Sequence, residues 1–370
     1  MTNKQLLHTP EGVRDIYGSE YKRKLTIEEK IRKSIASYGY EAIQTPTFEF
    51  FDVFSKEVGT TPSKDLYKLI DKDGETLVLR PDFTPSIARC AAKYFMDETK
   101  PLRFTYEGNT FVNVSHLQGK LKETTQMGAE LILDDSVEAD AELIAMVVSA
   151  LQAAGLNHFQ ISVGHMDYFK GLCEEAGLSE EKEQELRKAI AGKNMFAARD
   201  ILDTLDICPK VRKALMEVAD LFGAMQDLSY AKSLVENERS VSAIERLEAL
   251  QKLLKCYGVA EYVSFDLGML SQYHYYTGIV FKAFTYGIGD AIVKGGRYDK
   301  LLSYFGKEAP AVGFMVIVDD ILEALERQNI LVDTGKEIIT LTYTEDTFTE
   351  VLSKAKELRS KGNAVVLTKE

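Results

Sequence analysis

The sequence predicts an α+β fold in which helices flank a mostly antiparallel sheet. Strand-like patterns gather in two blocks, one before residue 167 and one after residue 260, and a helix-rich stretch separates them. Neither block repeats the strand–helix–strand unit that would indicate a parallel sheet. A chain of 370 residues is long enough to bury at least one large core and to form two domains.

The first block, residues 1–166, is predicted to be the first part of the sheet domain. An amphipathic helix over residues 20–38 has Lys and Glu on its outer face, and its inward positions are Leu25, Ile27, Ile31, Ile35 and Tyr38. A predicted hairpin turn at residues 72–75 begins the strand that leads directly to Arg80-Pro81-Asp82. The other elements expected are strands over 41–45, 76–79, 102–111, 126–133 and 159–163, and a helix from the Ser136 cap to Ala154, stopped by Gly155.

The rest of the chain is predicted to hold a helical insertion, a second part of the sheet domain and a small terminal unit. Dense charge with few Gly and Pro residues indicates the insertion over 167–260. The second part, 261–331, contains strands over 263–267, 277–284, 291–294 and 312–318 and a helix over 319–328. Residues 336–370 follow a linker and form one strand–helix–strand unit, with strands over 337–343 and 364–367 and a helix over 346–361.

The overall charge argues against nucleic acid as the main partner. The formal net charge is −12 and the isoelectric point is about 5.1, whereas a protein that holds a long polyanion usually shows a basic face.

No apolar run is long enough to cross a membrane, and the first residues lack a signal-peptide core. We therefore expect a cytoplasmic protein.

No metal or cofactor site is indicated by the sequence. The four cysteines lie far apart, which fits free thiols, and the five histidines show no metal-ligand spacing. There is no P-loop, and the glycine pair Gly295-Gly296 precedes Tyr-Asp rather than a dinucleotide-binding fingerprint. We expect neither a cofactor nor a metal.

One stretch keeps the framework of an ATP-using ligase site without its cations. The retained segments are Tyr273–Gly278, Gly295–Asp299 and Pro310–Phe314, and the last leads into Asp319-Asp320. Phosphoryl chemistry depends on fixed positive charge that stabilises the transferring group. A pocket with these walls and a carboxylate pair in place of a cation indicates a sensor rather than a catalyst.

An ordered series of motifs resembles histidyl-tRNA synthetase over about residues 9–328. The motifs are Thr9–Asp15, Tyr38-Gly39-Tyr40, Leu79–Thr84, Gln126–Glu130, Tyr275-Tyr276-Thr277 and Gly295–Asp299. The resemblance implies the class II aminoacyl-tRNA synthetase fold and a dimer formed through the Pro46 region. The aromatic residues that follow Pro46 are expected to pack in the core or in the dimer contact; they are Phe48, Phe50, Phe51 and Phe54. Residues 336–370 resemble only the beginning of the anticodon-binding domain.

The chain departs from the synthetase pattern at three positions that would hold ATP. Val112, with Val114 nearby, stands where the resemblance places an arginine and a glutamate, and Ser271 stands where it places a second arginine. Asp320 replaces the closing arginine, which reverses the charge. Removing one transition-state cation typically costs about 10²-fold in rate, so the loss of three implies no useful adenylation. If the alignment were shifted by a residue or two, one of the nearby arginines, Arg297 or Arg103, could take the place of a lost cation.

The amino-acid half of the synthetase pocket is largely retained. The resemblance implies that Asp82, Thr84 and Gln126 face the α-amino group of histidine, that Glu130 and Tyr276 hold its imidazole, and that Tyr298 lines the pocket. Carboxylates pair with an ammonium, and a Glu/Tyr pair satisfies two ring nitrogens. Asp82 departs slightly from the pattern, because the synthetases have glutamate there.

The combination of retained and lost positions resembles the regulatory subunits of ATP phosphoribosyltransferase. That likeness implies a non-catalytic chain that activates a short catalytic subunit in the first step of histidine biosynthesis, transmits feedback inhibition by histidine, and assembles as a dimer within a hetero-octamer. Histidine could then bind either the synthetase-like pocket or the contact with the catalytic subunit. Two other functions stay open at this point, a divergent histidyl-tRNA synthetase or histidine-activating ligase and a tRNA-sensing pseudo-synthetase.

Overall fold

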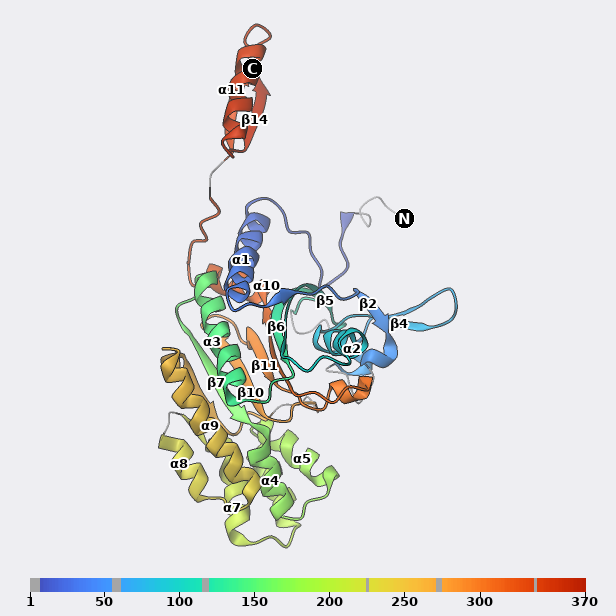
Figure 1. The fold of residues 1–370 in the computed structure, drawn as a ribbon, viewed down its shortest axis with the longest axis vertical. Helices are drawn as coiled ribbons and strands as arrows, with labels where there is room; N and C mark the ends of the chain where they lie inside the picture. Colours follow the sequence, from blue (N-terminus) through green and yellow to red (C-terminus); the bar gives the residue numbers. More distant parts are fainter. Residues whose placement is uncertain (1–6, 55–60, 115–119, 224–225, 271–274, 336–337) are drawn as a thin grey trace.

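The computed structural model describes residues 7–54, 61–114, 120–223, 226–270, 275–335 and 338–370 (Figure 1). Its main feature is a nine-stranded sheet whose strands, in spatial order, are β1 (Glu41–Ala42), β5 (Leu102–Phe111), β6 (Glu123–Ile132), β12 (Ala311–Ile317), β11 (Val293–Arg297), β10 (Ile279–Thr285), β7 (Phe159–His165), β9 (Val263–Asp266) and β8 (Phe222–Gly223). The strands from β5 to β7 in this order are antiparallel, as predicted, whereas the β1–β5 and β7–β9 pairs are parallel.

Four helices of the sheet domain complete its layers. They are α1 (Gly18–Ala36), α2 (Thr84–Tyr94), α3 (Val137–Ala154) and α10 (Val318–Arg327). The predicted caps of α3 are confirmed: Ser136 Oγ accepts a hydrogen bond from the Ala139 amide at 3.2 Å, and Gly155 ends the helix with a φ of 109°. Most of α3 is buried, because it packs against α1, α9 and β12.

The described residues of the stretch predicted to be helical contain six helices, which gather near β7 (Figure 1). They are α4 (Met166–Glu175), α5 (Glu180–Ala191), α6 (Met195–Asp203), α7 (Pro209–Glu217), α8 (Gln226–Ser233) and α9 (Glu238–Cys256). The short strand β8, which the prediction missed, pairs with β9 and attaches this group to the sheet. Two residues are too few to show a strand periodicity. The apolar core continues from α1 and α3 into these helices.

The outer face of α1 differs from the prediction. Leu25, predicted to face inward, is 45% exposed, whereas Lys24 and Glu28, predicted to face solvent, are only 6% and 7% exposed. Both charged side chains point toward the sheet, and Lys24 Nζ lies 2.7 Å from the Asp319 carboxylate at the start of α10. Helical periodicity identifies only apolar inward positions, so it cannot detect a charged position buried by an ion pair.

A second, three-stranded sheet carries an exposed apolar face. Its strands are β2 (Phe48–Phe50), β4 (Thr76–Leu79) and β3 (Lys68–Ile70), in that order. The register places Phe50, Leu77 and Leu69 in one row, with Phe48 beside Leu79 on the same face. Phe48, Phe50 and Leu69 are 55%, 57% and 47% exposed, while Phe54 is buried in the core beneath the sheet. Of the aromatic cluster, Phe54 therefore belongs to the core, and Phe48 and Phe50 remain free for an interface.

The terminal strand–helix–strand prediction is confirmed. It consists of β13 (Ile339–Tyr343), α11 (Phe348–Ser360) and β14 (Val365–Lys369), and the two strands pair in parallel. The Tyr343 and Phe348 rings meet edge to face with centroids 5.0 Å apart, which joins the helix to the sheet. In the part of the chain that the structure describes, no helix combines the length and the apolar character needed to cross a membrane.

A buried ion pair connects two elements of the sheet domain with a helix of the insertion. Asp140 on α3 is fully buried, and its carboxylate accepts hydrogen bonds from Arg297 of β11 at 2.7 Å and from Arg246 of α9 at 2.7 Å. Arg297 also donates to the Asp134 carbonyl at 2.9 Å. Breaking a buried pair by removing one partner leaves the other charge uncompensated, which typically costs about 3–5 kcal/mol.

We therefore expect Asp140→Ala to lower the free energy of unfolding by about 3–5 kcal/mol, because Arg297 would keep its charge in a buried site. Chemical denaturation followed by circular dichroism measures the change. Glu138→Ala is the matched control, since Glu138 lies on the same helix and is exposed. A loss for Asp140→Ala no larger than that of the control would show that the ion pair is not structural.

Candidate functional site

The predicted site residues come together around one cavity of about 970 Å³, which we call the front cavity. It lies against β5, β6 and β12 and between the N-terminal ends of α2 and α10. Of the predicted positions, those that line it are Asp82, Thr84, Gln126, Tyr276, Tyr298, Val112 and Asp320. Glu130 lies directly behind the wall, and Ser271 lies outside the described residues.

Gln126 lines the front cavity and carries a buried, unsatisfied acceptor. The alternation of β6 turns Gln126 toward the front cavity, opposite Gly108 on one neighbouring strand and Ile317 on the other. Its side chain is 7% exposed, and Gln126 Oε1 accepts no hydrogen bond from the described residues. A buried acceptor left unpaired costs about 1–3 kcal/mol, so a ligand that donates to this oxygen gains that free energy.

Glu130 binds two of the predicted residues from behind. Thr84 Oγ1 donates to one carboxylate oxygen at 2.8 Å, and the Tyr298 hydroxyl donates to the other. Only glycine fits at position 313, because a Cβ there would lie 1.6 Å from Glu130 Oε2. Burial raises the pKa of Glu130 to about 8, while the hydrogen bonds from Tyr298 and Thr84 lower it. Glu130 thus fixes the two hydroxyl-bearing walls of the front cavity.

The Gly295-Gly296 pair, prominent in the sequence, makes room for aromatic rings. A Cβ on Gly296 would lie 2.7 Å from the Tyr276 ring, and one on Gly295 would lie 2.4 Å from the Phe281 ring. Tyr276 can therefore lie flat against β11 and contact Tyr275, whose ring centroid is 4.5 Å away. The glycines shape an aromatic wall rather than a phosphate-binding loop.

Asp82 is held at the entrance of α2, where the chain leaves β4. Its carboxylate accepts a hydrogen bond from the Thr84 amide at 3.0 Å, which orients it at the first turn of the helix. Phe83 is buried and stacks on Tyr106 with ring centroids 4.5 Å apart. Phe83 therefore fills the core behind the cavity, and Asp82 stays in the wall.

Charge in the front cavity favours a cation over a polyphosphate. The described lining includes eight carboxylates, Glu20, Asp65, Asp82, Asp290, Asp319, Asp320, Glu323 and Glu326, against three cations, Arg14, Lys120 and Lys294. Each cation already has a carboxylate partner: Arg14 lies 2.6 Å from Glu20, and Lys120 and Lys294 lie 3.0 Å and 3.7 Å from Asp290. A triphosphate would meet net negative charge here.

Two of the three positions expected to have lost the ATP-binding cations, Val112 and Asp320, line this part of the cavity. Val112 presents an apolar side chain to the front cavity. Asp320 lines it too, and burial together with the carboxylates of Asp290, Asp319 and Glu323 raises the pKa of Asp320 to about 6. Asp320 is therefore mostly ionised at neutral pH and adds negative charge where a triphosphate would need a cation.

Neither arginine considered for a misalignment lines the front cavity. Arg297 is held by Asp140, as described above, and Arg103 pairs with Glu142 beside the Tyr40 ring. Arg80 is also buried elsewhere, where its guanidinium donates to the carbonyls of Thr45 and Asn109 at 2.9 Å. Among the described residues, no three or more His, Cys, Asp or Glu side chains are placed to hold a metal ion.

By its fold and pocket, the chain is a class II synthetase-like protein, and it matches the histidyl-tRNA synthetase family over residues 12–321. A solved structure described as an ATP phosphoribosyltransferase regulatory subunit/histidyl-tRNA synthetase from Bacillus halodurans superposes with a TM-score of 0.90 and 34% identity, over 98% of this chain and 93% of that chain.

Curated relatives define the family more narrowly. The ATP phosphoribosyltransferase regulatory subunit of Ruminiclostridium cellulolyticum is 42% identical over 87% of this chain and 77% of its own length. That of Acetivibrio thermocellus is 39% identical over 97% of this chain and 86% of its own length. The chain belongs to the family of ATP phosphoribosyltransferase regulatory subunits.

Sequence reasoning missed some residues of the cavity wall. Asp290 and Lys294 come from the β10–β11 region, and neither belongs to a motif that the sequence singled out. Arg14 belongs to the Thr9–Asp15 motif, but no role in the pocket was predicted for it. Only the pairing of distant strands brings them beside Gln126. The Asp319-Asp320 pair was the one local signal that this part of the pocket is acidic.

The raised pKa of Glu130 predicts a specific pH dependence of stability. Its ordinary value is 4.5 and its folded value is about 8, so between these values the folded protein holds a proton that the unfolded chain has lost. This contribution to stability is fully present below pH 4.5 and is lost as the pH rises through about 8. The slope reaches at most about 1.4 kcal/mol per pH unit.

Glu130→Gln keeps the shape of the side chain and removes this titration. Urea denaturation at several pH values gives the free energy of unfolding of the wild type and of Glu130→Gln. We expect the difference, wild type minus variant, to fall as the pH rises from 5 to 8. Parallel curves over that range would show that Glu130 is ionised in the folded protein throughout.

Proposed function

We propose that this chain is a non-catalytic regulatory subunit that activates a short catalytic ATP phosphoribosyltransferase and mediates feedback inhibition by histidine. The observation that carries the proposal is the uneven lining of the front cavity. Its amino-acid side keeps a buried acceptor and an ordered hydroxyl cluster, whereas its triphosphate side has carboxylates and paired cations. The family of its relatives supports the same role in histidine biosynthesis.

Histidine fits the chemistry of the retained half. Its α-ammonium would donate to Gln126 Oε1 and pair with Asp82, which relieves the unsatisfied acceptor. Its imidazole would lie between Tyr276 and Tyr298, with Glu130 acting on it through the Tyr298 hydroxyl. Glu130 is then a residue that orients the pocket, in addition to the direct contact that the synthetase resemblance implies.

The lost adenylation arginines account for the absence of a catalytic role in this proposal. Val112 and Asp320 cannot stabilise a pentacoordinate phosphorus in the transition state, and no free cation of the described lining replaces them. Regulation then works by linkage: histidine and the active arrangement of the catalytic partner favour different states of the assembly. The contact with the catalytic subunit is an alternative location for the histidine site.

The exposed apolar face of the three-stranded sheet supports the proposed dimer and, through it, the larger assembly, which we place in the cytoplasm. Phe48, Phe50 and Leu69 present an apolar surface next to Pro46, where the synthetase resemblance places the dimer contact. A dimer of this chain would then organise catalytic subunits into a hetero-octamer.

Calorimetric titration with histidine tests the site directly. Gln126→Ala should weaken binding by about 10-fold or more, because the ammonium loses a buried acceptor. Glu130→Ala should also weaken it while leaving the dimer intact, since Thr84 and Tyr298 lose their partner. Arg103→Ala, outside the front cavity, is the control. Unchanged affinity in both pocket variants would move the histidine site to the contact with the catalytic subunit.

Catalysis is tested separately with ATP. We expect no detectable ATP-dependent rise in melting temperature, and no exchange of labelled pyrophosphate into ATP in the presence of histidine, because the cavity repels a triphosphate. Histidyl-tRNA synthetase serves as the positive control. Robust exchange by the purified chain would contradict the regulatory proposal and favour a histidine-activating ligase.

A further inference from the structure

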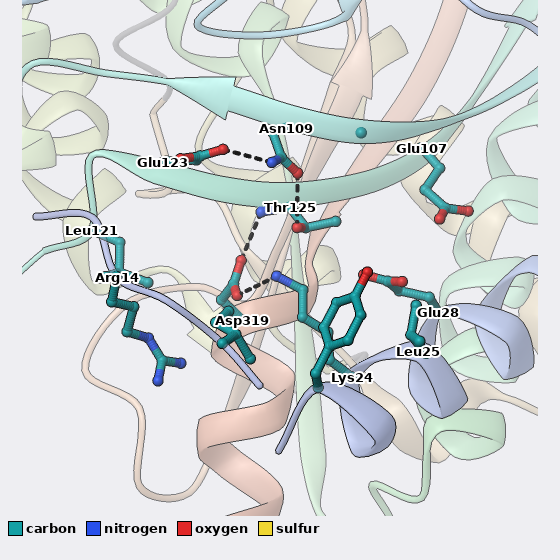
Figure 2. Close-up of a pocket in the computed structure, with 13 residues that line it drawn as sticks. Arg14, Lys24, Leu25, Glu28, Glu107, Asn109, Leu121, Glu123, Thr125 and Asp319 are labelled. Carbon is teal, nitrogen blue, oxygen red and sulfur yellow. Dashed lines mark hydrogen bonds and ion pairs between the residues drawn. The ribbon is translucent and has the colours of Figure 1, made fainter. Parts of the chain in front are cut away.

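A second cavity of about 480 Å³ lies on the opposite face of the same sheet, between α1 and the strands β5 and β6 (Figure 2). We call it the back cavity. Its polar lining consists of Arg14, Lys24, Glu28, Glu107, Asn109, Glu123, Thr125 and Asp319, and its apolar lining of Ile16, Tyr21, Leu25 and Leu121.

Strand alternation separates the two cavities. On β6, Gln126 faces the front cavity, while its neighbour Thr125 faces the back cavity, opposite Asn109 of β5. Asp319, at the start of α10, borders both. The residues proposed to bind histidine therefore do not extend into the back cavity, and its chemistry has to be derived from its own side chains.

Most charges of the back cavity are satisfied by neighbours. Asp319 accepts from Lys24 Nζ at 2.7 Å and from the Thr125 amide at 2.6 Å. Glu123 accepts from Asn109 Nδ2 at 2.6 Å (Figure 2), and Glu107 accepts from Arg32 Nη2 at 2.7 Å. These contacts fix the walls and leave little charge to attract a ligand.

Glu28 is the exception. Its side chain is only 7% exposed and projects from α1 into the cavity (Figure 2), yet no described residue hydrogen-bonds or ion-pairs with it. Arg32, one turn along the helix, donates to Glu107 and Glu29 instead. Burial, together with the nearby Glu107 and Asp319, raises the pKa of Glu28, and the charges of Lys24 and Arg32 oppose this effect. A carboxylate that faces the cavity without a hydrogen-bonded partner gains from a cation that reaches it.

The apolar part of the lining indicates the kind of cation. Tyr21 and Leu25 line the cavity and are 47% and 45% exposed, which is unusual for large apolar side chains on a helix that packs on a sheet. A ligand with a hydrocarbon chain would cover them and gain the free energy of apolar burial. A bare metal ion would not, and the described residues offer no group of three ligands for one.

We propose that the back cavity binds a small alkylammonium ligand, such as an alkyl diamine, with an ammonium group at Glu28 and the hydrocarbon chain against Tyr21 and Leu25. Glu107, on the facing strand, borders the same site and pairs with Arg32, which leaves Glu28 to the ligand. This site is independent of the proposed histidine site.

Calorimetric titration with 1,4-diaminobutane, in the presence of saturating histidine, tests the proposal. Wild type should bind, and Glu28→Gln should bind at least 10-fold more weakly, because the carboxylate that pairs with the ammonium is gone. Glu29→Gln is the matched control, since Glu29 is the adjacent acid on α1 and does not line the back cavity. It should bind like the wild type.

Two further variants locate the diamine. Glu107→Gln, which alters the facing wall without changing α1, should also weaken binding, whereas Gln126→Ala in the front cavity should leave it unchanged. Circular dichroism checks that each variant is folded. No binding by the wild type, equal binding by Glu28→Gln, or loss of binding in Gln126→Ala would each overturn the proposal.

Discussion

The hydrogen-bonded carboxylate of Glu130 is the interaction on which the front cavity depends. It joins Thr84 at the start of α2 to Tyr298 after β11, and it fits against β12 only because residue 313 is glycine. A buried carboxyl group must find such donors, since an unpaired one would be costly. The same contact that organises the core therefore also places the hydroxyl groups of a binding pocket.

The contrast between the two halves of that pocket is the main evidence about function. Gln126 and the Glu130 cluster remain suited to an amino acid, while the opposite wall contains Asp319, Asp320 and Asp290. The proposed pocket, suited to an amino acid and lined by carboxylates where a triphosphate would lie, agrees with the regulatory family to which the chain belongs.

Much of the fold could be predicted from the sequence, because local signals determine it. The hairpin turn at residues 72–75 located β4, and Ser136 and Gly155 defined both ends of α3. The two parallel pairings and the short β8 could not be predicted, since they depend on contacts between distant segments.

The candidate site, too, was predictable only where local signals or motifs determine it. The resemblance to synthetases identified seven of the residues that line the front cavity, but not that Glu130 lies behind its wall. Lys24 and Glu28 were predicted to face solvent, because a charged residue on a helix usually does. Lys24 is buried by its pairing with Asp319, a residue 295 positions away, which no local pattern reveals.

The most direct test is the structure of this chain in complex with a short catalytic ATP phosphoribosyltransferase and histidine. The account predicts histidine in the front cavity, with its α-ammonium at Gln126 and Asp82 and its imidazole beside Tyr276 and Tyr298. Histidine bound only at the contact between the two subunits, with the front cavity free of it, would contradict the account.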